Sequence, residues 1–167
     1  MPVLDIHELA AGKLSALFTR NASRDLFDTY YLFTQSKLDA AKLRLAFVVY
    51  IAMTTIDISK LNNYQLQYDL LDIRNKLLPV LRQQKLPRKS IELKNWADNL
   101  LDKIMEQMNM ILPLQSEEQE FIELIRENGD IRPNLITNDS NLQETILNHP
   151  AIKWATIKSS PKKRYIG

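Results

Sequence analysis

The chain has 167 residues, and its 22 lysines and arginines against 20 acidic residues give a formal net charge of +2. This length suffices for one domain with its own core, and the 45% hydrophobic fraction is ordinary for a soluble globular protein. Such a small net charge argues neither for nor against a nucleic-acid partner. The lack of cysteine excludes disulfides, thiolate metal sites and a cysteine nucleophile, and it fits a cytoplasmic protein.

Several kinds of ligand site are excluded by the residues that the chain lacks. With only three glycines, it contains no glycine-rich loop of the kind that cradles phosphates. His7 and His149 are the only imidazoles and lie far apart in the sequence, so no metal site is predicted. The longest apolar run, residues 45–53, is far shorter than the roughly 20 residues of a membrane-spanning helix, and no signal peptide is recognised. We expect no membrane partner.

The spacing of apolar and capping residues predicts an all-α multi-helix bundle. We expect one helical domain over residues 1–157 and a basic tail over residues 158–167, interpreted as a solubilising terminus. Asp5 should begin a first helix that runs to about residue 20. Ser23 should cap a second helix after a three-residue connection, so these two helices should pack side by side.

The remaining helices follow in chain order. Asp39 should cap a buried helix over residues 40–54. Three β-branched residues near its end leave a β-strand as the alternative there. Residues 66–83 have helical spacing that Pro79 should kink or shorten. Three further helices are predicted, over residues 90–111, 117–128 and 141–147. Ser90 and Ser116 should cap the first two, and Pro150 should end the third.

Charged residues near the start of the chain suggest a polar site. On a helical wheel Lys13 falls inside an apolar stripe, with Arg20 at its margin, and a buried ammonium is costly unless paired. Lys13 therefore either extends to water or meets an anion. Asp25 and Asp28 share one face of the next helix, where Arg24 could pair with Asp28. They form either a solvated face or, with Lys13 and Arg20, one polar pocket.

The same residues resemble a known family. The segments HELAAGKLSAL (residues 7–17) and RDLFDTYYL (residues 24–32), with Arg20 between them, are similar to the signature of the AbiEii/AbiGii toxins, which are nucleotidyltransferases. The segment HPAIKW (residues 149–154) also resembles the usual end of that family. The resemblance extends over the whole chain, with a divergent middle.

The resemblance implies a site that this chain supplies only in part. In the family, a Gly-Ser or Gly-Gly turn and an Asp-x-Asp pair hold Mg²⁺ against a nucleoside triphosphate. Lys13 would contact phosphate, Asp25 would be the acidic partner, and Arg20, Arg24 and Asp28 would support them. Such chemistry depends on positioning and charge neutralisation. This sequence contains neither the glycine turn nor an Asp-x-Asp pair.

Two functions follow from the resemblance. The first is the helical C-terminal part of an AbiEii-like toxin of the toxin–antitoxin or phage-defence type, inactive alone, acting on a nucleoside triphosphate and an RNA such as tRNA. The chain would then be a fragment, the remnant of a split gene, or one partner of a two-chain enzyme. The second is a non-enzymatic helical module that binds an antitoxin, a catalytic half-protein or RNA. In either case we expect Trp96 and Trp154 to serve packing.

Overall fold

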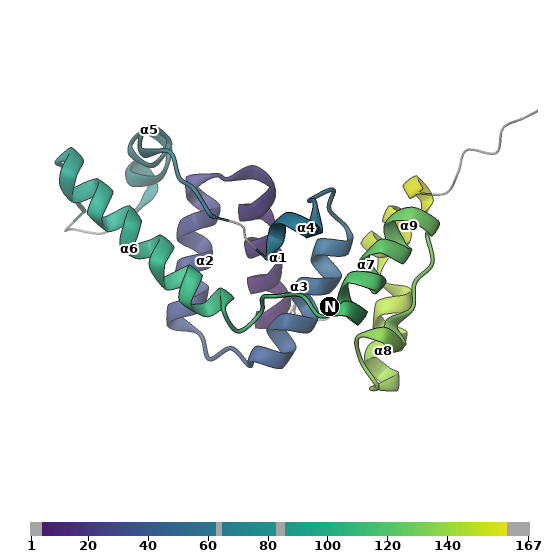
Figure 1. Ribbon diagram of the computed structural model, residues 1–167. Helices are drawn as coiled ribbons and strands as arrows, with labels where there is room; N and C mark the ends of the chain where they lie inside the picture. The colour runs from purple at the N-terminus through teal and green to yellow at the C-terminus, as the bar shows by residue number, and fades with distance from the viewer. Residues whose placement is uncertain (1–4, 63–64, 83–85, 160–167) are drawn as a thin grey trace, which may run out of the picture.

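The structure is a computed structural model, described here for residues 5–62, 65–82 and 86–159. Within these ranges helices dominate and no residue lies in a strand, which confirms the predicted all-α fold class. The helices form an elongated row, with α5 and the start of α6 at one end, α1 to α3 in the middle, and α7 to α9 at the other end (Figure 1). In the described part of the chain, no helix is long and apolar enough to cross a bilayer.

The central helix is α1 (Ile6–Arg20), which packs between α2 (Ser23–Gln35) and α3 (Ala40–Ala52). The predicted side-by-side packing of the first two helices is confirmed, and the strand alternative for the end of α3 is wrong. Because α1 has neighbours on two sides, its buried residues do not follow a single apolar stripe: polar Ser15 is buried, whereas apolar Leu9 is exposed. A single apolar stripe is typical of a surface helix that packs on one side, whereas α1 packs on two sides.

The connection between α1 and α2 differs from the prediction. Asn21 ends α1 in the left-handed conformation (φ 51°, ψ 34°), which asparagine tolerates well, and its N–H donates to the Leu17 carbonyl at 2.9 Å. The N-cap of α2 is Ala22, which has no capping side chain, so the prediction of Ser23 as the cap is wrong. Instead, the Ser23 N–H donates to Oδ2 of Asp72 at 3.0 Å.

The segment after α3 is more broken than its apolar spacing predicts. After α4 (Ile58–Leu61), the predicted helix over residues 66–83 appears as three short pieces: α5 (Leu70–Asp72), a π-helical turn (Ile73–Leu77) and a 3₁₀ turn (Leu78–Val80). Pro79 lies in the 3₁₀ turn, where its missing N–H and its ring prevent α-helical continuation. Together these pieces lie beside α2 and α6.

Two longer helices carry the second half of the chain. The first, α6 (Ser90–Met108), packs on α2 and ends three residues earlier than predicted, while α7 (Ser116–Asn128) packs on α3. Their N-caps are Lys89 and Gln115 rather than the two serines. Gln115 forms a capping box with Glu118, and Gly129 ends α7 in the left-handed conformation that glycine adopts readily.

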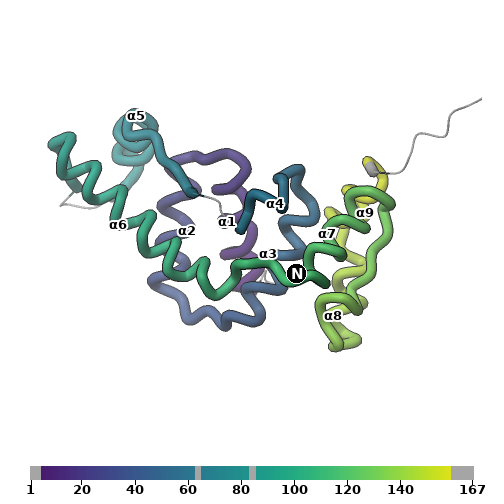
Figure 2. The backbone as a smooth tube through the Cα atoms, viewed as in Figure 1, coloured from purple at the N-terminus to yellow at the C-terminus, as the bar shows by residue number. Residues whose placement is uncertain are grey.

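The last helices differ most from expectation. After a 3₁₀ turn (Pro133–Leu135), α8 (Ser140–Asn148) is followed directly by α9 (Pro150–Ser159), which packs on α7 (Figure 2). Pro150 therefore begins a helix rather than only ending one, because the first turn does not need the N–H that proline lacks. Lys158, assigned by the prediction to the tail, lies in α9, and residues 160–167 lie outside the described residues.

Candidate functional site

The lysine of the family-like segment meets an aspartate of the next helix. Nζ of Lys13 lies 2.7 Å from Oδ2 of Asp28, and each side chain is 34% exposed. Of the two alternatives for Lys13, water or an anion, the structure shows contact with an anion, and the anion is the Asp28 carboxylate. The pair lies where α1 and α2 run side by side, so its separation of 15 residues in sequence is closed by the helix pairing. A third of the ammonium-bearing side chain remains open to a ligand.

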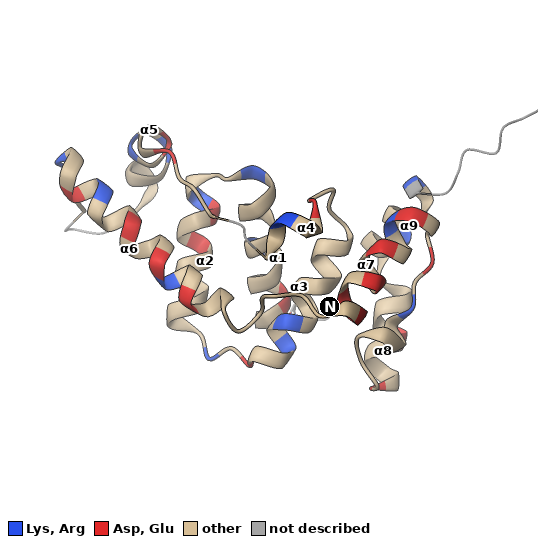
Figure 3. Cartoon of the chain, viewed as in Figure 1, with Lys and Arg blue, Asp and Glu red and all other residues tan. Residues whose placement is uncertain are grey.

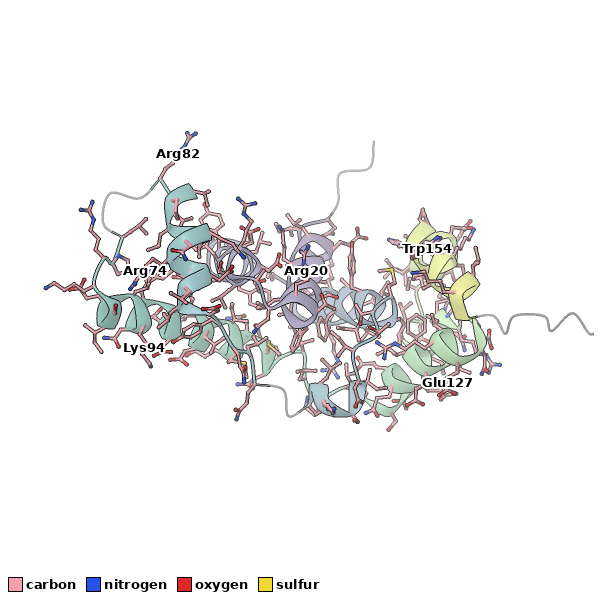
Figure 4. The ribbon with its side chains drawn as sticks, turned by 90° about the horizontal axis from the view of Figure 1, so that it is seen from above. Arg20, Arg74, Arg82, Lys94, Glu127 and Trp154 are labelled. Carbon is pink, nitrogen blue, oxygen red and sulfur yellow. The ribbon has the colours of Figure 1, made fainter. Side chains whose placement is uncertain are left out.

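A second ion pair lies nearer the connection between the helices. Arg20 donates to Oδ1 of Asp25 at 3.1 Å, with the aspartate side chain 7% exposed and the arginine 66% exposed. Figure 4 places Arg20 near the middle of the molecule. The four predicted residues therefore form two separate cross-links between α1 and α2 rather than the rim of one pocket. Arg24 is exposed, and the Arg24–Asp28 pair that the spacing allows is not formed; Asp28 binds Lys13.

The Lys13–Asp28 pair opens into a groove, the Lys13 groove, with a volume of about 310 Å³. Its walls are mainly apolar and comprise the following residues: Leu9, Lys13, Phe27, Asp28, Tyr31 and Leu32. Phe27 stacks against Tyr31 with ring centroids 6.4 Å apart and against Trp96 of α6 at 6.3 Å. Sequence reasoning missed the aromatic wall, although the four-residue spacing of Phe27 and Tyr31 on a helix could have revealed it.

This arrangement is suited to binding an anion. The Lys13 ammonium is held by a single carboxylate oxygen in a groove with little other polar lining, so a phosphate oxygen could replace Asp28 as its partner. Apolar walls lower the local dielectric and strengthen such a contact. The groove supplies positive charge and position, while Asp25, turned toward Arg20, supplies rigidity between the helices.

The described residues do not fit a divalent metal. No group of three histidine, cysteine, aspartate or glutamate side chains lies close enough to hold one, within the ranges that the structure describes. Mg²⁺ is bound through carboxylates, and both aspartates of the predicted site already face a cation. The Mg²⁺ implied by the family resemblance therefore has no ligand set among these residues.

A second cavity, of about 350 Å³, lies between the start of α1, α3 and α8. It brings together His7 and His149, which the sequence separates widely, but it contains none of the predicted site residues. Nε2 of His7 accepts the Asp39 N–H at 2.9 Å, so this imidazole helps to hold the start of α3. Burial, with Glu8 nearby, raises the pKa of Tyr50 in the same cavity. We place the candidate site in the slightly smaller Lys13 groove because it contains the lysine of the family-like segment.

Comparison with known proteins identifies the family. The chain matches the model described as the nucleotidyl transferase AbiEii toxin, type IV TA system, over residues 1–127. That range contains both ion pairs and the whole Lys13 groove, while residues 149–154 lie beyond it, so their likeness to the family's end stays a prediction. No significant match was found among curated proteins or among solved structures. The match covers 127 of the 167 residues, and the chain belongs to the AbiEii nucleotidyl transferase toxin family.

Proposed function

We propose that this chain forms the helical side of a nucleotidyltransferase site, in which Lys13 contacts the phosphates of a nucleoside triphosphate. The observation that carries the proposal is the position of Lys13, which lies in an accessible groove and is paired with one partly exposed aspartate. The family match supports the class of reaction. The groove supports the class of ligand, because the Lys13 ammonium lies between mainly apolar walls and has one carboxylate partner that a phosphate could replace.

The chemistry of these residues is exchange of one anion for another. Without nucleotide, Asp28 holds the Lys13 ammonium extended in the groove. When a triphosphate enters, the ammonium transfers its hydrogen bond to a phosphate oxygen and neutralises part of the charge that grows during transfer. The Arg20–Asp25 pair positions α1 against α2 and so keeps Lys13 in place. Leu9 and Tyr31 also line the groove and place apolar surface beside the ammonium.

The proposal extends to the other components of the reaction. The metal-holding carboxylates come from a polypeptide segment outside these 167 residues, since the sequence contains no Asp-x-Asp pair and the described residues form no metal cluster. By the family resemblance alone, the proposed acceptor is an RNA such as tRNA. An antitoxin controls the activity, as the toxin–antitoxin assignment of the family implies. By itself the chain binds triphosphate weakly and does not transfer a nucleotide.

Phosphate binding is testable on the chain as it is. Inorganic tripolyphosphate titrated into ¹⁵N-labelled protein should shift backbone signals around Lys13. Asp28→Asn should bind it about two- to fivefold more tightly, because a competing ion pair worth about 0.5–1 kcal/mol is removed. Lys13→Gln should lose the shifts around the Lys13 groove, while Lys42→Gln, a change at an exposed lysine of α3, should keep them. Equal binding by the Lys13 and Lys42 variants would contradict the proposal.

Transfer is tested by supplying the Asp-x-Asp half of a family member in trans. The reconstituted enzyme should transfer a labelled nucleotide to RNA, and Lys13→Ala and Asp25→Ala should each abolish transfer without loss of helical circular dichroism. Mg²⁺-dependent turnover of nucleotide by the chain alone would refute the proposal, as would a reconstituted enzyme indifferent to Lys13→Ala. Binding of the two halves without any transfer would instead favour the non-enzymatic helical module.

A further inference from the structure

Charge is distributed unevenly along this nearly neutral chain. Residues 73–91 contain six lysines and arginines and no acidic residue, whereas residues 92–127 contain nine acidic residues and three basic ones. In Figure 3 the acidic colour recurs along the visible faces of α6 and α7. The small net charge therefore conceals a basic region beside an acidic one, and the two regions must differ in the partners that they attract.

The structure gathers part of the basic region at one end of the row of helices. Four of its cations are described and exposed, and we call them the basic end: Arg74, Arg82, Arg88 and Lys89. A terminal nitrogen of Arg74 donates to the Ser90 hydroxyl at 2.8 Å, which ties the π-helical turn to the start of α6, directly after Arg88 and Lys89. Figure 4 shows Arg74 and Arg82 at this end, far from Trp154 at the opposite end.

The charges of the basic end are not neutralised within the described part of the chain. Ser90 is an uncharged acceptor, so its hydrogen bond leaves the charge of Arg74 intact. Neighbouring Lys76, by contrast, is paired with Asp72 at 2.6 Å. None of the four members of the basic end forms an ion pair with a described carboxylate, although ion pairs occur along the rest of the molecule. Four unpaired cations at one end form a surface for a polyanion.

We propose that the basic end binds the phosphate backbone of RNA. Three of its four cations are arginines, whose planar fork matches the geometry of phosphate oxygens. The described exposed aromatic side chains, Tyr31 and Trp154, lie on α2 and α9, so this end offers phosphate contacts without base stacking. The contact is therefore insensitive to RNA sequence. This inference deepens the proposed function and rests on it for the choice of RNA as the acceptor.

A lipid surface is the competing partner. The aliphatic side chains of Leu71, Val80 and Ile91 are exposed on α5, the 3₁₀ turn and α6. A membrane-bound amphipathic helix presents such residues on a single face, often with tryptophan, whereas these three lie on three different elements and Trp154 lies at the other end. The distribution of residues therefore favours RNA over an anionic membrane, and the experiment includes both.

The test measures binding of a fluorescent single-stranded RNA of mixed sequence to the full chain, without nucleotide, over a series of salt concentrations. Four phosphate contacts predict a slope of about −3 in the logarithm of the binding constant against that of the salt concentration. A quadruple glutamine variant of the basic end should bind about tenfold or more weakly at low salt, with a slope near zero. A control with the same charge change, in which Lys37, Lys42, Lys153 and Lys158 become glutamine, should bind like the unmodified chain.

Three outcomes would overturn the proposal. The first is an equal loss in the control, which would make the binding a property of net charge alone. The second is loss of binding only when Lys162, Lys163 and Arg164 are neutralised, which would assign RNA to the end of the chain. The third is binding to phosphatidylserine vesicles in preference to RNA. Because the quadruple variant leaves Lys13 unchanged, a loss of RNA binding in this variant is separate from phosphate binding at Lys13.

Discussion

Arg44 of α3 and Glu118 of α7 form a two-pronged ion pair between distant parts of the chain. Nε of Arg44 lies 2.6 Å from Oε1 of Glu118, and a terminal guanidinium nitrogen lies 2.7 Å from Oε2. That same nitrogen also donates to the Pro113 carbonyl at 2.7 Å. Oε2 in turn accepts the N–H of Gln115 at 2.7 Å and closes the capping box of α7. One guanidinium thus ties α3 to the start of α7.

Breaking this pair from one side should be costly. Arg44→Met leaves the largely buried carboxylate of Glu118 without its cation and should lower the free energy of unfolding by about 3 kcal/mol. Urea denaturation of Arg44→Met, Glu118→Gln and the double variant should give a coupling of at least about 1 kcal/mol. The exposed Lys103–Glu106 pair of α6 is the control and should couple by about 0.5 kcal/mol or less. Equal coupling in both pairs would refute this prediction.

Arg126 of α7 supports the end of α3. One terminal nitrogen donates to the Ile56 carbonyl at 2.6 Å, and the other donates to the Ile51 carbonyl at 2.7 Å. Burial lowers the pKa of this guanidinium. Arg126→Met removes both guanidinium donors from these carbonyls and should cost about 2–3 kcal/mol in urea denaturation. Arg126→Lys should recover only part of that, because a compact ammonium lacks the fork that reaches both oxygens.

The control for Arg126 is Arg132, which forms an exposed pair with Asp130. Arg132→Met should change the free energy of unfolding by no more than about 0.5 kcal/mol, as is usual at exposed positions. A loss at Arg126 no larger than the loss at Arg132 would show that the end of α3 does not depend on this guanidinium.

Asp72 should make part of the stability depend on acid pH. The Lys76 ammonium, followed by Ser23 of α2, lowers the pKa of this carboxyl from 3.8 to about 2. A lowered pKa means that the stabilisation is complete above about pH 4 and disappears as the pH falls toward 2. Asp72→Asn should therefore cost about 1 kcal/mol near neutral pH, as loss of an N-cap does, and nothing near pH 2.

Thermal unfolding followed over this pH range measures the effect of Asp72. Lys76→Gln keeps the contact between Asp72 and the Ser23 N–H but removes the largest cause of the lowered pKa, so its acid loss should be smaller and should be complete at a higher pH. A difference between Asp72→Asn and the unmodified chain that stayed constant from neutral pH to pH 2 would contradict the assignment.

The two tryptophans should differ sharply. Trp96 is half-buried and stacks on Phe27, so Trp96→Ala should cost about 2–3 kcal/mol, below the cost of a fully buried tryptophan. Trp154 is 60% exposed, and its ring is covered on one side by Lys158 with Nζ 3.7 Å from the centroid. The prediction that Trp154 serves core packing is wrong, and Trp154→Ala should cost about 1 kcal/mol or less. Equal losses in the free energy of unfolding for Trp96→Ala and Trp154→Ala would contradict this ordering.

Local features of the fold could be predicted from the sequence alone. Asp5 and Asp39 cap their helices, and Gly129 ends α7, because capping involves groups within one helical turn. The two alternatives for Lys13 came from equally local reasoning, since an ammonium on an apolar stripe of a helix either extends to water or needs an anion. The sequence of residues 7–32 also indicated the toxin family to which the chain belongs.

Only the tertiary structure decided which distant groups meet. Ser23 was expected to cap α2, but an aspartate 49 residues away binds its N–H instead. Both aspartates of α2 were open to Lys13, and it binds Asp28 while Asp25 binds Arg20. The reason is physical: helix formation and capping depend on neighbours in sequence, whereas long-range partners depend on how each helix is rotated and shifted against the next. Rotation and shift are set by the packing of the whole core, and no single segment contains that information.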